Sequence, residues 1–459
     1  MMAAGIRPVA TCAVDMSEAR PDAPELARLP RELVQRLTRP LAWFLRIEAA
    51  SSVILLSVTI AALVLSNSPW ADSFAAAWET RVGVQAGSIE VSRSLREWLN
   101  DGVMTLFFFL VALELKRELV LGELGNLRMA ALPAAAALGG MVVPAALYVL
   151  LISGLPGEAG WGTVMATDTA FVVGCLTILG SRIPQSLRVF MLSLAIIDDI
   201  GAILVVALGY SGGVAWAPLV LGAFGCAIVR GMALLGVRSV PVYCAAGVLI
   251  WSAVDVSGIH PTITGVVLGL LTPARRWVSD ERLYAILGEV VAHPVDGRGG
   301  DDTPDRETLQ VAEIAARETL SPVERLEVAL HPWVAFAIMP LFAFANAGTS
   351  ISPSDLGGPV SVAVFVGFVL GKPLGILAFS WLAVRSGIAL RAPDLEWRLV
   401  AGGGLLAGIG FTMALFIANL AFGQGLIQQA KLGIFAASVV SAAAGLVVLG
   451  GSPRRGIAR

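Results

Sequence analysis

Four ionisable residues of this sequence lie inside long apolar runs, where a charge is costly. They are Asp168, Asp198, Asp199 and Lys372. A charge at the centre of a lipid bilayer costs at least ~2.5–3.5 kcal/mol on insertion scales, so each group needs a partner, a water-filled cavity or a function. The sequence therefore predicts a polar site inside an otherwise apolar protein.

Asp198 and Asp199 are adjacent in the run MLSLAIIDDIGAILVVAL at 191–208. Neighbouring residues of a helix point about 100° apart, so one carboxylate can face a water-filled cavity while the other faces a packed partner. Two carboxylates this close disfavour double ionisation and are expected to titrate as a coupled pair. Such a pair can exchange a proton for a small cation. The alternative is a pair of helix caps or buried, hydrogen-bonded acids.

Lys372 lies in FVGFVLGKPLGILAFSWLAV at 365–384, and the chain has only 3 Lys against 29 Arg. Unlike Arg, a buried Lys can lose its proton, and it is the natural counter-charge for one of the aspartates. The alternative is a side chain that extends to the membrane interface.

Two stretches predict interrupted helices. Thr167 and Asp168 lie in WGTVMATDTAFVVGCL at 161–176, where short polar side chains compete for the backbone hydrogen bonds. The second stretch is the glycine-rich AGGGLLAGIGFTMALF at 401–416. Unwound backbone at membrane depth is tolerated only inside protein or beside water. We expect Asp168 and Lys372 to balance the helix ends exposed there. For the glycines alone, the alternative is close helix packing.

The composition places these residues in a membrane protein. Of 459 residues, 56% are apolar and 14% are charged, and the mean hydropathy is +0.79. Soluble domains carry about 25% charged residues, so soluble classes are excluded. A net charge of −2 argues against a nucleic-acid partner. Four Cys without a CxxC pattern predict neither a zinc site nor a disulfide framework, and we expect no cofactor.

We predict an all-α polytopic membrane protein with about twelve transmembrane helices. Spans 4 and 11 hold the two interruptions, and each is the middle of a three-span unit, 3–5 and 10–12. Paired interruptions of this kind predict inverted repeats around a binding site. The expected spans are 43–66, 99–118, 129–152, 162–181, 185–208, 214–236, 239–255, 259–273, 329–349, 360–385, 396–421 and 427–450.

The basic residues set the orientation of these spans. One side of the membrane carries 27 Lys and Arg, the other carries 4, and Lys372 lies within a span. The excess marks the cytoplasmic side. We therefore expect a cytoplasmic N-terminal tail at 1–42, a transmembrane domain at 43–450 and a cytoplasmic C-terminal tail at 451–459.

Two segments outside the spans carry their own predictions. Residues 274–328 are charged and contain Asp-Gly-Arg-Gly-Gly-Asp-Asp at 296–302, which predicts a long, disordered cytoplasmic loop. Residues 78–95 alternate polar and apolar side chains around Ala-Gly-Ser, which predicts an external β-hairpin. An ordinary polar loop is the alternative there.

Several motifs closely resemble those of NhaA-type sodium/proton antiporters. The resemblance covers roughly residues 43–450, without much of 278–320. The motifs are ATDTAF (166–171), LGSRIPQSLRVFMLSLAIIDDIGAI (179–203), LHPWVAFAIMPLFAFANAG (330–348), GKPLGI (371–376) and GIGFTMALFIANLAF (408–422). It implies a twelve-span fold in which the broken spans 4 and 11 cross.

The resemblance also assigns roles to the buried charges. It implies that Asp198 and Asp199 bind the cation and the proton, with Asp199 the closer ligand, and that Asp198 pairs with Lys372. Thr167 and Asp168 match positions at the broken helix. The hairpin at 78–95 resembles the contact through which the family forms homodimers.

A second set of residues resembles the groups that respond to pH in this family. A cytoplasmic cluster and one further histidine are implied, although the histidines can equally be ordinary interfacial residues. The candidates are Glu114, Arg117, Glu118, Glu327 and His331 for the cluster, and His260 for the further histidine.

These observations predict a secondary antiporter of the bacterial inner membrane, not an enzyme. It would export Na⁺ or Li⁺ for inward H⁺, electrogenically and under pH control, and so maintain cytoplasmic pH and sodium. The alternatives are a related transporter of another solute and, more remotely, an intramembrane aspartate-dependent enzyme. An aspartyl protease needs carboxylates that face each other from two helices, whereas Asp198 and Asp199 are adjacent on one.

Overall fold

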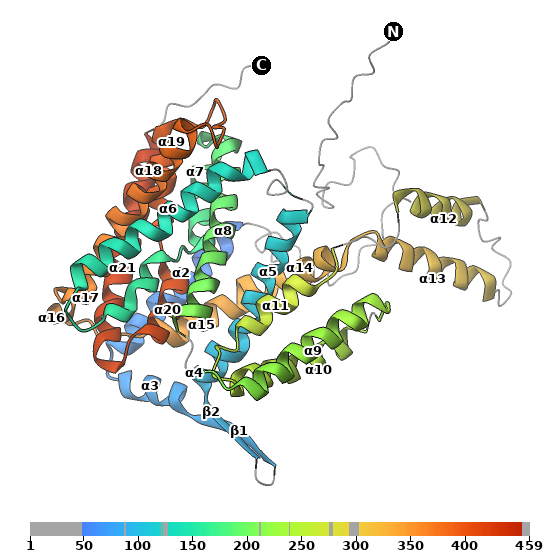
Figure 1. Ribbon diagram of the computed structural model, residues 1–459, viewed down its shortest axis with the longest axis horizontal. Helices are drawn as coiled ribbons and strands as arrows, with labels where there is room; N and C mark the ends of the chain where they lie inside the picture. Colours follow the sequence, from blue (N-terminus) through green and yellow to red (C-terminus); the bar gives the residue numbers. More distant parts are fainter. Residues whose placement is uncertain are drawn as a thin grey trace. The chain divides into compact units, whose positions relative to one another are not determined.

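The structure is a computed structural model. It describes residues 48–86, 89–120, 122, 127–210, 213–237, 239–274, 279–292 and 303–451. The predicted N-terminal tail and nearly all of the C-terminal tail lie outside the described residues. The described part is mostly helical (Figure 1), as the apolar composition predicts.

The first described segments are two helices followed by a hairpin. α2 (Glu48–Ser66) and α3 (Ala71–Glu79) meet at a bend of 113°. β1 (Arg81–Ala86) and β2 (Ile89–Ser94) pair antiparallel, with Ala86 opposite Ile89, which confirms the hairpin predicted at 78–95. A continuous helical segment follows, made of α4 (Leu95–Glu97), the π-helix η2 (Trp98–Val103) and α5 (Met104–Val120).

The next segments include the stretch at 161–176, for which the sequence predicts an interrupted helix. They are α6 (Leu127–Ile152), the 3₁₀-helix η4 (Glu158–Met165), α7 (Thr169–Leu179), the 3₁₀-helix η5 (Gly180–Arg182) and α8 (Gln185–Gly209). The middle of the chain then forms α9 (Trp216–Leu234), α10 (Val240–Val256), α11 (Ile263–Leu271), α12 (Asp280–Ala292) and α13 (Thr303–Glu318).

The C-terminal segments include the stretch at 401–416, for which the sequence predicts the second interrupted helix. They are α14 (Pro322–Trp333), the π-helix η6 (Val334–Ile338), α15 (Met339–Asn346), α16 (Pro353–Leu356), α17 (Pro359–Val366), the π-helix η7 (Gly367–Gly371), α18 (Lys372–Arg385), α19 (Trp397–Ala407), α20 (Phe411–Ala421) and α21 (Gln424–Gly450).

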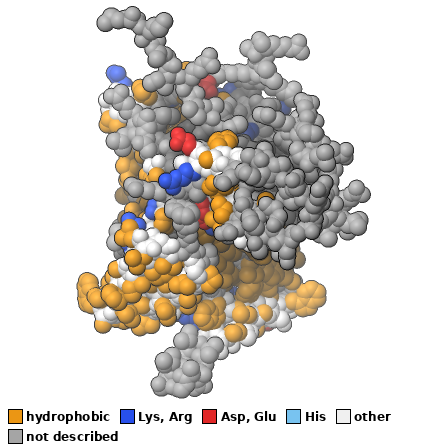
Figure 2. All heavy atoms as spheres, turned by 90° about the vertical axis from the view of Figure 1, so that its right-hand side faces the viewer, with side chains coloured by type: hydrophobic (Ala, Val, Ile, Leu, Met, Phe, Trp, Pro, Cys, Tyr) orange, Lys and Arg blue, Asp and Glu red, His pale blue; other side chains and the backbone are white. Residues whose placement is uncertain are grey.

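Seven helical segments of the described chain are long and apolar enough to cross a membrane, or up to nine if each of two bent pairs is one span. Each of the twelve expected ranges also contains helical residues. Three of these ranges hold none of the candidates: the range of α5, which continues from α4 and η2, that of α10, and that of the nine-residue α11. The surface agrees with a lipid environment, because hydrophobic side chains cover much of the described face in Figure 2.

The prediction of disorder for 274–328 is wrong where the chain is described. α12 and α13 are helices that pack against each other, and α14 begins inside the same range. The stretch 296–302 lies outside the described residues.

The physical reason is that the high charge concealed a helical repeat. Leu283, Ile286 and Leu287 recur at three- and four-residue spacing in α12, which is the period of a helix with one apolar face.

The packing of α6 against α18 brings the second half of the chain onto the first (Figure 1). Glycines make this contact close: a Cβ on Gly139 of α6 would overlap the Gly375 carbonyl oxygen of α18, and a Cβ on Gly375 would overlap that of Gly139. Lys372 begins α18, so this crossing sets the position of its side chain.

We expect Gly375→Ala to lower the free energy of unfolding by about 1–3 kcal/mol, because the added methyl group must push α6 and α18 apart. Thermal unfolding of the purified protein measures the effect. Gly231→Ala in α9 is the matched control, since no atom lies within 4 Å of its Cβ position. Equal melting temperatures for the two variants would contradict the close contact.

Candidate ion-binding site

Two interruptions of the helical chain meet at the centre of the described structure. Between η4 and α7 the backbone is extended, with ψ of 148° at Ala166 and 98° at Asp168. Between α19 and α20 the chain bends by 47°. The two breaks are joined directly, because the Asp168 N–H donates to the Ile409 carbonyl at 2.7 Å. Four helix ends therefore converge on one small region.

Asp168 satisfies the positive ends of two of these helices. It is 1% exposed and is the N-cap of α7, with the Phe171 N–H donating to Oδ1 at 3.4 Å. Its Oδ2 accepts from the Thr412 N–H at 3.0 Å and from the Thr412 hydroxyl, at the start of α20. Helix N-termini favour negative charge, so Asp168 has a structural role in holding both breaks, as the sequence predicts.

Lys372 binds the negative, carbonyl end of one of these helices. Its side chain is fully buried. The ammonium group donates to the Met165 carbonyl, the last residue of η4, and to Asp198 Oδ2 at 2.8 Å. The carbonyl end of a helix favours a cation. Lys372 thus balances one helix end and one aspartate, and it does not extend to an interface.

Asp198 is held on the packed side of α8. It is 1% exposed, and Oδ2 accepts from the Thr167 hydroxyl at 2.5 Å as well as from Lys372. Its other oxygen, Oδ1, is buried and receives no hydrogen bond from the described residues. The alternative of a merely hydrogen-bonded acid does not describe Asp198, because it forms a buried ion pair.

Asp199 faces a different environment from its neighbour. Its side chain is half-buried, and among the described residues the Thr169 hydroxyl donates to its Oδ2 at 3.5 Å, which is long for a hydrogen bond. Within the described chain it makes no ion pair. The divergence of adjacent helical side chains thus separates the two acids, as predicted from the sequence: one is paired and the other is available.

The described residues contain no cluster of three or more His, Cys, Asp or Glu that would hold a tightly bound metal ion. The region where the two breaks meet instead offers one available carboxylate, Asp199, with the Thr169 hydroxyl 3.5 Å from its Oδ2. Three acids, Asp168, Asp198 and Asp199, stand against one base, Lys372. This balance suits a weakly held cation of low charge better than an anion.

Four of the six candidates for pH response lie together where α5 meets α14. Arg117 forms ion pairs with Glu118, at 3.1 Å, and with Glu327. Glu114 is one helical turn before Arg117 and Glu118 on α5, which places it on the same face. His331 follows Glu327 by one turn on α14 with an exposed side chain.

His260 belongs to a different cluster. Its Nε2 lies 3.6 Å from Asp101 Oδ1, and its Nδ1 is 2.8 Å from the Thr262 hydroxyl. Arg93 of the hairpin joins this group through Asp101, at 2.6 Å, and Asp255. Asp101 and Arg117 are 16 residues apart on one helical segment, which is about 24 Å. His260 is therefore not part of the Glu114 cluster.

Sequence reasoning missed several of these partners. Thr412, Asp101 and Asp255 were not predicted, although the two acids interrupt apolar runs and so carried a signal. Lys431 is another buried basic residue: it is 5% exposed within α21 and donates to the Gly348 carbonyl at 3.1 Å.

Comparison with known proteins assigns the family. Residues 42–449 match the family described as Na⁺/H⁺ antiporter 1. The chain belongs to this family. It is 59% identical to "Na(+)/H(+) antiporter NhaA 1" of Acidiphilium cryptum over 94% of this chain and 96% of the relative. It is 59% identical to the NhaA antiporter of Rhizobium meliloti over 92% and 97%. It is 54% identical to NhaA 2 of Vibrio vulnificus over 92% and 95%.

The resemblance drawn from the motifs is therefore confirmed. This member of the NhaA antiporters is a multi-pass membrane transporter for sodium and protons, and not an enzyme. The intramembrane-enzyme alternative is excluded by that membership.

We expect Lys372→Ala to destabilise the protein by about 3–5 kcal/mol, because it leaves Asp198 buried without a counter-charge. Chemical denaturation of the purified protein measures the loss. The double variant Lys372→Ala with Asp198→Ala should recover a large part of it, because it removes the unpaired charge. Additive losses in the double variant would contradict the ion pair.

Asp168→Ala should lower the melting temperature more than Asp168→Asn. Alanine removes the acceptor that caps α7 and α20, and each lost cap costs about 0.5–2 kcal/mol. Asparagine keeps an acceptor oxygen. Differential scanning of both variants separates the two effects. If Asn and Ala at this position were equally destabilising, capping would not be the role of Asp168.

Proposed function

We propose that the exchange of Na⁺ for H⁺ takes place at the Asp198–Asp199 pair, with Asp199 as the direct ligand. One observation carries this assignment: the two acids are unequal. Asp198 is fully buried and bound to Lys372 at 2.8 Å, whereas Asp199 is half-buried and makes no ion pair with a described residue. One acid is fixed in place, and its neighbour can receive an ion.

Competition for Asp199 couples the two ions. A carboxylate oxygen is a good ligand for a hard cation such as Na⁺ or Li⁺, and the Thr169 hydroxyl, 3.5 Å away, can add a second oxygen. A proton on Asp199 removes its negative charge and releases the cation. Loss of the proton restores the site. Because the pair titrates as a unit, the same carboxylates serve both ions in turn.

Asp198 and Lys372 set the charge of the site during the cycle. Two carboxylates can bind two protons in place of one Na⁺. We therefore infer that the exchange is electrogenic and responds to the membrane potential. The inward flow of protons then drives sodium out and supports cytoplasmic pH and sodium homeostasis.

The proposed architecture has twelve spans, with spans 4 and 11 discontinuous and the units 3–5 and 10–12 related as inverted repeats. The bonds between the two breaks support this arrangement, since Asp168 of one contacts Ile409 and Thr412 of the other. The excess of Lys and Arg on one side supports cytoplasmic termini in the bacterial inner membrane. We further propose a homodimer that forms through the hairpin at 78–95.

We assign the response to pH to the cluster around Arg117. Its two ion pairs, with Glu118 and Glu327, tie α5 to α14, so protonation of either acid weakens a contact between helices. Glu114 lies on the same face of α5. His331 and His260 are further candidates. His260 would act through Asp101, which is 3.6 Å from its Nε2 and lies about 24 Å from Arg117 along the helical segment.

We expect Asp199→Asn to abolish Na⁺-dependent proton flux while the protein still folds, because an amide cannot exchange a proton for a cation. Everted membrane vesicles that hold a respiratory pH gradient report the flux when NaCl or LiCl is added. The protein level and the melting temperature of the variant establish that it folds.

The matched control is Asp72→Asn in α3, an exposed aspartate far from the breaks in sequence, which should transport normally. Retained sodium-dependent flux in Asp199→Asn would overturn the assignment of the site. Absence of flux in the parent protein at every pH would point instead to another transported solute.

A further inference from the structure

The sequence contains only five asparagines, and three of them form one hydrogen-bonded group. Asn100 belongs to η2, Asn346 is the last residue of α15, and Asn419 lies near the end of α20. We call these three residues the asparagine cluster. No step of the proposed exchange uses them.

Asn346 is the centre of the asparagine cluster and is 1% exposed. Its amide nitrogen donates to Asn100 Oδ1 at 2.8 Å and to the Phe342 carbonyl at 3.0 Å. Its Oδ1 accepts from Asn100 Nδ2 at 3.4 Å and from Asn419 Nδ2 at 3.1 Å. Both hydrogens and both lone pairs are therefore used. A buried group satisfied in this way makes a contact that is costly to break in part.

α20 connects the asparagine cluster to the ion-binding site. At its first turn Thr412 is bound by Asp168, and seven residues later Asn419 is bound to Asn346. Seven residues of α-helix span about 10 Å, and the 11 residues of α20 contain no proline. A displacement at the Asp168 end is therefore carried to the Asn419 end.

An aromatic layer lies between these two ends. The ring centroid of Phe416, on α20, is 5.3 Å from that of Phe108, 6.2 Å from Phe342 and 5.5 Å from His260. The three phenylalanines are at most 3% exposed. A hydrated cation cannot pass through closely packed rings, so in this state the layer separates the asparagine cluster from the aspartate pair.

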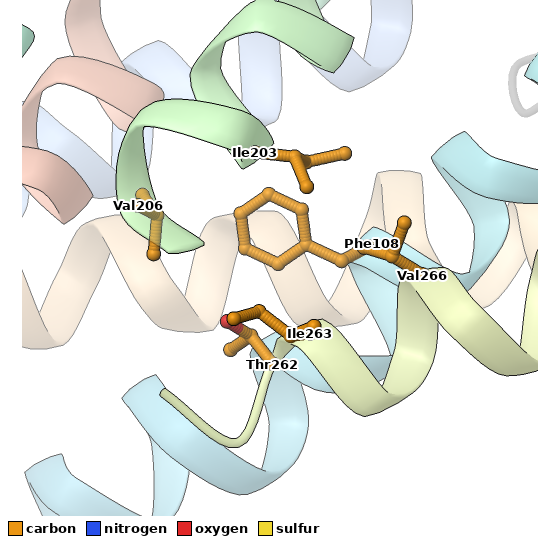
Figure 3. Close-up of a pocket in the computed structure, with 6 residues that line it drawn as sticks. All are labelled: Phe108, Ile203, Val206, Thr262, Ile263 and Val266. Carbon is orange, nitrogen blue, oxygen red and sulfur yellow. The ribbon is translucent and has the colours of Figure 1, made fainter. Parts of the chain in front are cut away.

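Mostly apolar side chains surround one edge of the aromatic layer. In Figure 3 the ring of Phe108 lies between Ile203 of α8 and residues at the start of α11. The small pocket in this view is lined by Phe108, Ile203, Val206, Thr262, Ile263 and Val266.

We propose that the asparagine cluster is a latch that holds α20 against η2 and α15 and keeps the aromatic layer closed. The site opens toward the asparagine side only when Asn419 leaves Asn346. The inference rests on the proposed function, because a transporter that opens alternately to two sides needs such a contact to break and re-form.

The test weakens the latch and measures access to α20. Asn419→Leu removes the hydrogen bond from α20 to Asn346 and keeps a side chain of similar size. The reporter is Leu415→Cys, at a fully buried position of α20, in a variant whose four native cysteines are replaced. We expect a membrane-impermeant maleimide added from the asparagine side to label the introduced thiol about fivefold faster, the factor for one hydrogen bond of about 1 kcal/mol.

Asn67→Leu is the matched control. Asn67 also joins distant segments, donating to the Thr349 carbonyl and accepting from the Ile351 N–H, both at 2.9 Å, but neither partner is on α20. Labelling should not change in this variant. Equal labelling rates for Asn419→Leu and its parent would overturn the latch.

A transport measurement separates a latch from general damage. In Asn419→Leu the apparent KM for Na⁺ should fall on the asparagine side relative to the other side, while the saturated rate stays within about twofold. Equal loss of rate from both sides would mean that the asparagine cluster only supports the fold, and would also overturn the latch. Absence of exchange in the parent would overturn the proposed function instead.

Discussion

A charge inside an apolar environment must have a partner, and this requirement organises the centre of the protein. Helix ends carry partial charges of their own, and four of them converge where two interrupted helices meet. Asp168 serves two positive ends, and Lys372 serves one negative end together with Asp198. Each break would be unfavourable alone. The two breaks stabilise each other because Asp168, which caps a helix at one break, also binds Thr412 at the other. The close packing of α6 and α18 places Lys372 beside the two breaks.

The same pairing leaves one acid of the pair without an ion-pair partner among the described residues. Lys372 neutralises a single aspartate, and the turn of α8 directs its neighbour to a half-buried position. A fully paired site would hold no ion, and a site of several free carboxylates would hold a cation too tightly to release it. In the proposed site Asp199 is the one available ligand, and we therefore expect a cation to bind there weakly enough for a proton to displace it. Conformational change can then act on α20, which begins at the same crossing.

The charged residues of the candidate site can be found from the sequence alone, because a charge within an apolar run stands out from its neighbours. The structure buries all three: Asp198 and Lys372 form an ion pair, and Asp168 accepts hydrogen bonds at the starts of two helices. Their neutral partners could not be predicted, since Thr412 and the Met165 carbonyl reach the site only through the crossing of segments distant in sequence. The helices within 274–328 were missed for another reason: their charge favoured disorder, although their apolar residues recur with a helical period.

Sodium binding to the purified protein, measured by calorimetry over a series of pH values and buffers, tests most directly whether one pair of carboxylates serves both ions. We expect Na⁺ binding to release protons, and the apparent Kd for Na⁺ to rise about tenfold per unit fall in pH for each proton displaced. Buffers of different ionisation enthalpy count those protons. Sodium binding that releases no protons and keeps the same affinity across the series would contradict the shared site.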